Sequence, residues 1–367
     1  MGSEMVFAFG VGLFMGYIYG AMEQDAMTDY DVVIVGGGAA GLMCAAQAGK
    51  RGRRALVIEK SKSVGEKIRI SGGGRCNFTN LHAAPANYLS ENAHFCVSAL
   101  RRYTQQDFIA LVEAYGIAYH EKTLGQLFCD GSSKQIIQML LDECAAGEVD
   151  IRTQAKVEKV AQHGAGFTVT LGDGKKITTA SLVIATGGPS IPKMGATGWG
   201  YAIARQFGLN VIEQRAALVP FTLDETQMER LRPLAGIAVD GEAACGKTQF
   251  REGILFTHRG LSGPAILQIS SYWREGEPVT LNLLPDQDLA NDLQTQRSHN
   301  PKQEVATALA ALLPKKLAAF LCEAAGVQGR LADCSNAALQ KLADQVQRWA
   351  ITPSGTEGYR TAEVTLG

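Results

Sequence analysis

Three glycines, Gly36, Gly38 and Gly41, follow the spacing G-x-G-x-x-G and carry the clearest chemical signal in the sequence. In such a motif the first glycine permits a tight turn, the second lets backbone approach a pyrophosphate, and the third lets a helix pack closely on a strand. Glu59 follows Gly41 by 18 residues, the position of an acid that binds ribose hydroxyls. Because this acid would repel a 2′-phosphate, the spacing predicts a site for the adenosine half of FAD or NAD rather than NADP.

The residues around this motif predict the strand and the helix that such a site requires. Residues 31–35 predict a strand, since the continuous apolar run that follows Asp31 is typical of a parallel strand buried on both faces. Residues 42–51 then predict a helix, ended by Gly52, whose first N–H groups face the phosphate. A second strand, 55–58, ends at Glu59. The alternative is a glycine turn that packs the helix on the sheet and binds no ligand.

A second glycine cluster lies in the segment Ser71–Asn80, which reads Ser-Gly-Gly-Gly-Arg-Cys-Asn-Phe-Thr-Asn. Its three consecutive glycines offer N–H groups without side chains in the way, which suits a phosphate or a flat ring. Arg75 can add a guanidinium fork, and Asn77 and Asn80 can hydrogen-bond a ribityl chain or a ring edge. Cys76 could meet a flavin, but it has no partner cysteine nearby, which favours a packed thiol. The alternative for the whole segment is a flexible glycine loop.

A third segment, Leu182–Gly188, is an apolar strand that ends in Thr-Gly-Gly and so brings backbone near a cofactor. Alternation and turn residues predict three short antiparallel strands before it, at 156–160, 167–171 and 176–179. A buried strand, a glycine motif, a β-meander and an Ala-Thr-Gly strand together form the layout of two-dinucleotide-binding flavoproteins. We therefore predict an α/β fold with an FAD-binding Rossmann-like domain, and FAD as its cofactor.

These motifs resemble those of the BaiN/YhiN family, the dehydro-bile-acid reductase-like NAD(P)/FAD-dependent oxidoreductases. The matching segments are Val35–Gly41, Ser71–Asn80, Thr186–Gly188, Gly195–Tyr201, Leu218–Phe221, Leu255–Pro264 and Gly355–Thr365. The resemblance extends from about Asp31 to the last residue, and it implies FAD binding, a redox role and a cytoplasmic location. The predicted cofactor-binding residues are Gly36, Gly38, Ala39, Ala40, Gly41, Glu59, Lys60, Lys67, Ser71, Gly72, Gly73, Gly74, Arg75, Cys76, Asn77, Thr186, Gly187 and Gly188.

The chain departs from this family at both ends. The family continues beyond the position of Gly367 into a segment that helps hold the flavin, so we expect a truncated chain with weakened FAD affinity. At the other end, residues 5–22 carry no charge, and as a helix they would span about 27 Å at ~1.5 Å per residue, close to the thickness of a bilayer core. The alternatives are a membrane anchor and an over-extended start; we favour the second, since Met27 leads directly into the first strand.

The domain organisation is predicted from changes of pattern along the chain. The predicted parts are an apolar extension at 1–26, an FAD-binding domain at 27–204, a small β-barrel insertion at 205–289, a helical insertion at 290–350 and a truncated return to the FAD domain at 351–367. Helices are predicted at 105–115, 134–144, 303–313 and 337–349, and barrel strands at 217–223, 235–239, 248–253 and 278–284.

Outside the flavin domain, the segment Thr257–Pro264 holds the predicted catalytic residues, His258 and Ser262. His258 could exchange a proton with substrate while hydride moves to or from the flavin, and Ser262 could orient the substrate. The alternative is that the glycines and the proline of this segment shape a turn in which His258 binds nearby backbone.

Composition limits the classes of partner that we expect. The chain has 35 basic and 36 acidic residues and a formal net charge of −1, so bulk charge predicts no nucleic-acid partner. Eight cysteines form no C-x-x-C pair and no set with zinc spacing, which predicts reduced thiols, a cytoplasmic location and no metal site. A membrane partner is expected only if residues 5–22 are an anchor.

The predicted function is that of an FAD-dependent oxidoreductase that transfers hydride between the flavin and a small or medium organic substrate. NAD(P)H or oxygen is the other redox partner, and NAD(P)H would visit transiently because no second G-x-G-x-x-G is present. One alternative is a non-catalytic FAD- or nucleotide-binding fragment. Another is a flavin-dependent RNA-modifying enzyme, against which the near-neutral charge argues.

Overall fold

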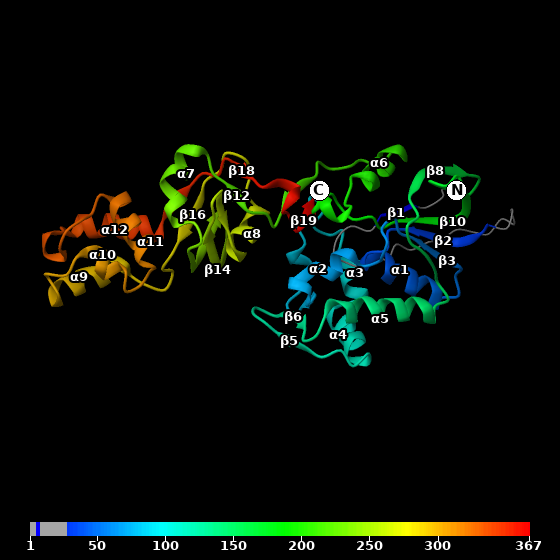
Figure 1. Cartoon of the computed structure of the whole chain (residues 1–367), viewed down its shortest axis with the longest axis horizontal. Coiled ribbons are helices and arrows are strands. Elements are labelled where there is room, and N and C mark those ends of the chain that lie inside the picture. Colours follow the sequence, from blue (N-terminus) through cyan, green and yellow to red (C-terminus); the bar gives the residue numbers. More distant parts are fainter. Residues whose placement is uncertain (1–4, 8–27) are drawn as a thin grey trace. The chain divides into compact units, whose positions relative to one another are not determined.

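The computed structural model describes residues 5–7 and 28–367 and divides the chain into two units. The first unit ends at Glu213, and the second comprises Gln214–Leu366 (Figure 1). The finer division predicted from the sequence, into a barrel, a helical insertion and a return segment, stays a prediction.

A mainly parallel sheet forms the centre of the first unit. Its strands are β2 Tyr30–Val35, β3 Ala55–Ile58, β7 Asp150–Arg152, β8 Val157–His163, β9 Gly166–Leu171 and β10 Lys176–Ile184. They lie in the order β7-β3-β2-β10-β9-β8, in which the first four are parallel and the β8–β10 meander is antiparallel. The predicted strands agree with this sheet except at one point: the third meander strand, 176–179, and the strand predicted to start at Leu182 are one continuous strand, β10. The predicted α/β fold class is confirmed.

Burial on both faces of the sheet explains the unbroken apolar run Val32–Val35 of β2. The elements that cover the sheet include three helices, α1 Ala39–Lys50, α5 Ser133–Ala146 and α6 Trp199–Gln206 (Figure 1). Val32 and Ile34 pack into a hydrophobic core with residues of α1 and α5. Val33 and Val35 point the other way, into a core with residues of the meander and of α6. Since successive side chains of a strand alternate between faces, every position from Val32 to Val35, the buried part of β2, must be apolar.

Between β3 and β7 the chain leaves the sheet and forms short helices and a three-stranded sheet. These elements are α2 Glu66–Ile70, β4 Asn77–Asn80, α3 Val97–Arg102, α4 Gln105–Ala114, β5 Tyr119–Glu121 and β6 Gln126–Cys129, with strand order β4-β6-β5. The Thr104 hydroxyl accepts the Asp107 N–H at 3.3 Å, and the Asp107 carboxylate accepts the Thr104 N–H at 2.7 Å. This reciprocal cap starts α4 where the sequence predicts it.

The predicted apolar extension is described only at Met5–Phe7, which form β1 and pair in parallel with β10. The rest of the run 5–22 lies outside the described residues, so the choice between an anchor and an over-extended start stays a prediction. Within residues 5–7 and 28–367, no helix has the length and apolar character needed to cross a membrane.

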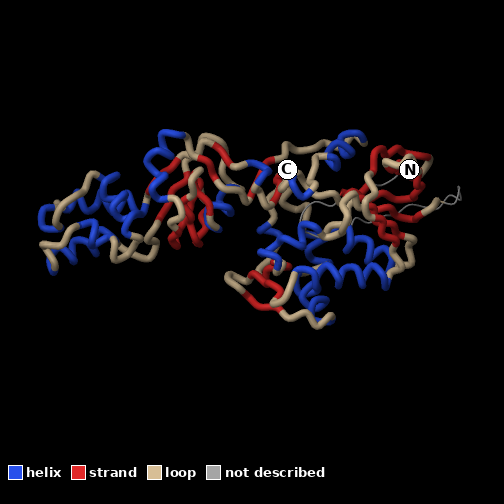
Figure 2. The backbone as a smooth tube through the Cα atoms, in the orientation of Figure 1, coloured by secondary structure: helices blue, strands red, loops and turns tan. Residues whose placement is uncertain are grey.

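The second unit contains a seven-stranded antiparallel sheet with the order β17-β16-β13-β14-β15-β12-β18. The strands are β12 Phe221–Thr222, β13 Ala238–Cys245, β14 Thr248–Phe256, β15 Gly260–Ser262, β16 Val279–Asn282, β17 Trp349–Ile351 and β18 Gly355–Thr356. Six helices belong to the unit: α7 Glu225–Leu231, α8 Pro264–Ser270, α9 Leu289–His299, α10 Val305–Leu309, α11 Lys315–Ala325 and α12 Asn336–Gln347. Figure 2 shows that the last four gather beside the sheet, and one hydrophobic core continues through sheet and helices.

The first and last strands of the second unit are neighbours. β11 (Arg215–Ala217) and β19 (Val364–Leu366) pair in an antiparallel ladder. Both ends of the unit therefore lie side by side, which is the geometry that an insertion into another domain requires.

Candidate functional site

The turn between β2 and α1 contains the G-x-G-x-x-G motif, and each glycine has its own structural reason. Gly36 has a φ of +113°, and a Cβ there would lie 2.4 Å from the Ala185 carbonyl oxygen. A Cβ on Gly41 would lie 1.9 Å from the Gly36 carbonyl oxygen, so close packing of the helix excludes a side chain. A Cβ on Gly38 would meet nothing within 4 Å, so this face of the backbone is open to a ligand.

The amino end of α1 supplies hydrogen-bond donors to this open face. Gly38 is the N-cap of α1, no side chain caps the helix, and no acidic residue lies in its first turn. The first N–H groups, which include those of Ala39, Ala40 and Gly41, therefore lack acceptors within the helix. Together with the helix dipole they form an anion site that suits a diphosphate.

Glu59, at the carboxyl end of β3, lies beside the same turn. Its carboxylate accepts the Gly37 N–H at 2.8 Å and the Ser61 N–H at 2.7 Å, one on each oxygen. Each oxygen keeps a lone pair for a further hydrogen bond, such as one from a ribose hydroxyl. The contact with Gly37 places the acid where the sequence spacing predicts it.

Thr186, at the carboxyl end of β10, has a buried hydroxyl without a partner among the described residues. It lies against the glycine turn, because a Cβ on Gly36 would be 3.0 Å from the Thr186 nitrogen. β2 and β10 are neighbours at the point where the strand order reverses, and open α/β sheets bind ligands at such a point. Since a buried unpaired hydroxyl costs about 1–3 kcal/mol, a ligand that bonds Thr186 would be stabilised here. The unpartnered Thr186 hydroxyl and the open face at Gly38 both fit a dinucleotide cofactor.

The triple-glycine segment follows α2 as an exposed turn. Gly72, Gly73 and Gly74 have φ values of +57°, +66° and +87°, so three successive positions need the left-handed backbone that glycine adopts without strain. A Cβ on Gly72 would lie 2.6 Å from the ring of Phe128, whereas one on Gly73 would meet nothing within 4 Å. Ser71 anchors the turn, since its hydroxyl donates to the Ile68 carbonyl at 2.9 Å. The bare backbone of this turn is accessible to a flat or anionic ligand.

The residues after the glycines differ in what they can reach. Arg75 and Asn77 are exposed, and no carboxylate pairs with Arg75 in the part of the chain that the structure describes. Cys76 is 4 % exposed and packs in the hydrophobic core, where burial raises the pKa of its thiol. Asn80 donates to the Leu124 carbonyl at 3.0 Å and accepts a backbone N–H at 2.8 Å, so it stabilises its own loop. This placement favours the packed-thiol interpretation of Cys76.

Two lysines connect the chain after β3 to the loop after β10. Lys67 Nζ donates to the Ser190 hydroxyl at 2.9 Å, and Lys60 Nζ donates to the Gly195 carbonyl. Both acceptors are neutral, and among the described residues no carboxylate pairs with either lysine. Desolvation by the surrounding protein lowers the pKa of Lys67. Thus the predicted residues of β2, β3, α2 and the end of β10 meet at one edge of the sheet, whereas no sequence pattern pointed to Ser190.

The predicted catalytic residues lie in the second unit, at the turn between β14 and β15. The Thr257 hydroxyl accepts the N–H of Arg259 at 3.2 Å and that of Gly260 at 3.1 Å, so Thr257 rather than His258 stabilises the turn. His258 is exposed, and no hydrogen bond or ion pair joins its ring to residues 28–367. Ser262 is half-buried in β15. Their catalytic roles stay predictions.

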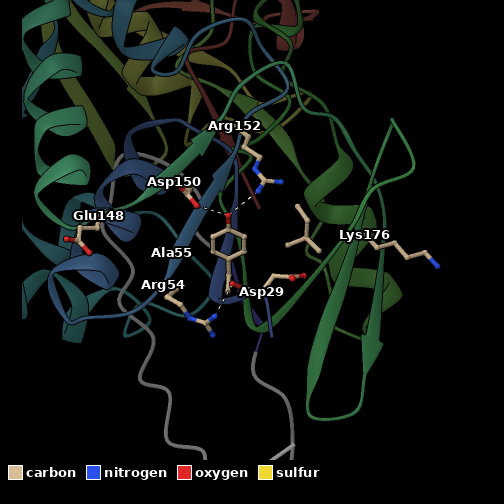
Figure 3. A pocket seen from close by; sticks show the side chains of 9 residues that line it. Asp29, Arg54, Ala55, Glu148, Asp150, Arg152 and Lys176 are labelled. Atoms are coloured by element: carbon tan, nitrogen blue, oxygen red, sulfur yellow. Dashed lines mark hydrogen bonds between the residues drawn. The ribbon is translucent and has the colours of Figure 1, made fainter. Parts of the chain in front are cut away.

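A pocket at the opposite edge of the parallel sheet has a different character (Figure 3). It lies at the amino ends of β2, β3, β7 and β10, and its centre is Tyr30, whose hydroxyl donates to Asp150 at 2.6 Å and accepts from Arg152 at 3.1 Å. Burial, and then the bond to Asp150, raises the pKa of Tyr30. Arg54 pairs with Asp31 at 2.9 Å. Because these polar groups satisfy one another, the pocket is a network that ties the strands together.

Comparison with known proteins gives one family match and three informative relatives. A family described as HI0933-like protein Rossmann domain matches residues 30–359. A ribosomal RNA dihydrouridine synthase of Escherichia coli is 54 % identical over 347 residues, covering 93 % of this chain and 86 % of the relative. A protein of the same name from Haemophilus influenzae is 47 % identical over 341 residues, covering 91 % and 84 %. A 3-dehydro-bile acid delta(4,6)-reductase of Clostridium scindens is 25 % identical over 354 residues, covering 91 % and 85 %.

The prediction that the protein has no nucleic-acid partner is wrong. It rests on the net charge of −1, whereas two relatives that match most of the chain bear names that specify a ribosomal RNA substrate. Net charge averages over the whole chain, but association with a polyanion depends on where the charges lie. Residues 60–75 alone contain five basic residues and one acidic residue.

Proposed function

The chain belongs to the HI0933-like family, and from this membership we propose that it is a flavin-dependent ribosomal RNA dihydrouridine synthase. The observation that carries the proposal is the 54 % identity, over 93 % of this chain, to a relative of that name. The turn Gly36–Gly41, Glu59 and Thr186, which we call the dinucleotide cradle, support the proposal. Reduction of a uracil ring needs a source of hydride. The proposal replaces the predicted small or medium organic substrate with a uridine of ribosomal RNA.

Separate groups of the dinucleotide cradle fit separate parts of FAD. The amides of α1 and the open face of Gly38 would hold the diphosphate, and Glu59 would hold the adenosine ribose. The Thr186 hydroxyl would bond a polar group of the cofactor, and the glycine turn 71–74 would lie against its flavin half. When bound, FAD would supply the hydride for the reaction. NADH or NADPH would provide the electrons by a transient visit, since the sequence contains no second G-x-G-x-x-G.

The reaction adds two electrons and two protons, in sum two hydrogen atoms, across the C5–C6 double bond of uracil. Hydride goes to one carbon and a proton to the other, so the enzyme needs a proton donor near the base. His258 is our candidate for that donor because its exposed ring is bonded to no described residue. Ser262, four positions further along the chain in β15, is the candidate that orients the base.

The test is direct detection of the product. Purified protein with FAD, under anaerobic conditions and with NADH or NADPH, is incubated with unmodified transcripts of ribosomal RNA. We expect nucleoside mass spectrometry to show a gain of about 2 Da on uridine, which corresponds to two added hydrogens. A matched reaction without reductant should show none.

The same preparation distinguishes the original prediction from the proposal. A conjugated dienone steroid serves as the competing substrate, because the relative at 25 % identity is named a 3-dehydro-bile acid reductase. If NAD(P)H reduces the flavin and the steroid is consumed while ribosomal RNA stays unchanged, the proposal is wrong and the small-substrate function stands.

A further inference from the structure

Positive charge gathers at the cofactor edge of the first unit without matching negative charge. Five exposed cations lie there, and we call them the basic rim: Lys60, Lys62, Lys67, Arg75 and Lys193. None of the five forms an ion pair with a carboxylate among the described residues. The two nearby acids are already engaged, because Glu59 binds backbone amides and Glu66 lies 3.7 Å from Arg69.

Hydrogen bonds hold two members of the basic rim, Lys60 and Lys67, against one loop. Lys67 reaches Ser190 and Lys60 reaches Gly195, so the chain after β3 lies along the loop after β10. Lys62 is two residues from Lys60, and Lys193 is two residues from Gly195. At ~3.6 Å per residue, the Cα of Lys62 lies within about 7 Å of that of Lys60, and the Cα of Lys193 lies within about 7 Å of that of Gly195. The rim is therefore a continuous feature of one unit rather than scattered charge.

The cofactor does not account for this much positive charge. Its diphosphate would carry two negative charges, and the uncapped amino end of α1 already provides a site for them. Lys67 and Arg75, next to the glycine turns, can complete the neutralisation. Lys62 and Lys193 are exposed, and no hydrogen bond or ion pair joins either side chain to a described residue. Two or more cations are therefore left for another anion.

We infer that the basic rim is the surface that binds the phosphate backbone of the RNA substrate and brings it to the cofactor. The inference rests on the proposed function. Lysines at this edge would contact phosphates and fix the position of the strand, without reading its sequence. This explains how a chain of net charge −1 can bind a polyanion, since the cations of the rim have no carboxylate partner among the described residues and act locally within a Debye length of about 10 Å.

The test compares two double charge reversals in the full chain with FAD. Lys62→Glu/Lys193→Glu changes the rim, and Lys159→Glu/Lys176→Glu changes two exposed lysines of the β8–β10 meander by the same amount. Filter binding to unmodified ribosomal RNA transcripts is measured from 50 to 300 mM salt. We expect the rim pair to bind about tenfold more weakly at 0.1 M salt, with a salt slope smaller by about 1.4, or ~0.7 for each lost contact to single-stranded phosphate. The meander pair should bind as the unchanged protein does.

The outcomes separate this inference from the proposed function. If the unchanged protein holds FAD but binds no ribosomal RNA, both fail. If it binds RNA and makes dihydrouridine while the rim pair matches the meander pair, only the assignment of the surface fails. Absorbance of bound flavin and its reduction by NAD(P)H should be the same in both pairs. Should the rim pair lose its flavin, Lys62→Gln/Lys193→Gln takes its place, and an unchanged salt slope in that variant overturns the inference.

Discussion

Two glycines of the same motif should respond in opposite ways to the addition of one methyl group. Gly38 has φ −83° and ψ −171°, which alanine adopts, and open space where its Cβ would lie. Gly38→Ala should therefore leave the unfolding temperature of the cofactor-free chain nearly unchanged but should block binding of the FAD diphosphate. Gly41→Ala places a Cβ 1.9 Å from a carbonyl oxygen and should destabilise the fold by about 1–3 kcal/mol. Calorimetry and flavin titration measure both effects, and equal unfolding temperatures for the two variants would refute this account.

The buried hydroxyl of Thr186, which has no partner among the described residues, gives a second prediction for a single residue. Thr186→Val removes a buried polar atom that has no protein partner, so the cofactor-free chain should be as stable as before or more stable. FAD affinity should fall about fivefold, since a lost hydrogen bond is worth ~1 kcal/mol and 1.4 kcal/mol is a factor of ten. A fall in the stability of the cofactor-free chain would mean that the hydroxyl has a structural partner instead.

Residues that act through local spacing were predictable, and those that act through distant contacts were not. The roles of Gly36 and Gly41 follow from the motif, because the turn that needs them is local. The bond between Lys67 and Ser190 joins residues 123 positions apart, and no sequence pattern indicates it. Ile191 in the same loop has φ +55°, a left-handed backbone that β-branched residues rarely adopt. Such strain becomes visible only when the surrounding structure is known.

At the scale of elements, one carboxylate links three helices. Glu143 of α5 accepts the Tyr115 hydroxyl at the end of α4, at 2.9 Å, and pairs with Lys50 of α1. Desolvation, and next the bond to Glu143, raises the pKa of Tyr115 to about 12. The ordinary value is about 10, so the contribution to stability is complete below pH 10 and is lost as the pH rises toward 12.

Substitution of this tyrosine tests the link. Tyr115→Phe should lower the free energy of unfolding by about 1 kcal/mol at pH 7, the value of one hydrogen bond. Between pH 10 and 12 the difference between the variant and the unchanged protein should shrink, because the bond is being lost in the latter. Urea titrations at pH 7, 10 and 11 measure it. A difference that stays constant over this range would show that the Tyr115 hydroxyl does not contribute through its bonded proton.

The predicted helices agree best with the structure where the sequence has both apolar residues at helical spacing and a residue that marks the end of the helix. α4 and α5 lie at the predicted 105–115 and 134–144 to within two residues, since each begins at a hydroxyl cap. α9 and α11 were not predicted as separate helices. α9 has few apolar residues, of which Leu289, Ala290 and Leu293 are buried, and α11 begins directly after Pro314, a residue that by local pattern indicates the end of a helix. Tertiary packing rather than local pattern defines these two.

At the scale of the whole molecule, the division into two units predicts where a protease cuts first. Residues 209–214 join the units and form neither helix nor strand, and Leu209 and Ile212 are 46 % and 40 % exposed. Brief digestion with chymotrypsin should therefore cleave after Leu209 and leave two resistant fragments. Mass spectrometry of the fragments identifies the cut. Early cuts spread through both units would contradict the division at Glu213.

The ladder between β11 and β19 has a consequence for how such proteins diversify. Because the chain enters and leaves Gln214–Leu366 through two adjacent strands, recombination at two neighbouring points could exchange the whole cassette between lineages. The nucleotide-holding scaffold would keep its chain order through such an exchange. Relatives that share one ancestral scaffold could in this way come to act on substrates as different as a bile acid and ribosomal RNA, which the names of two relatives specify.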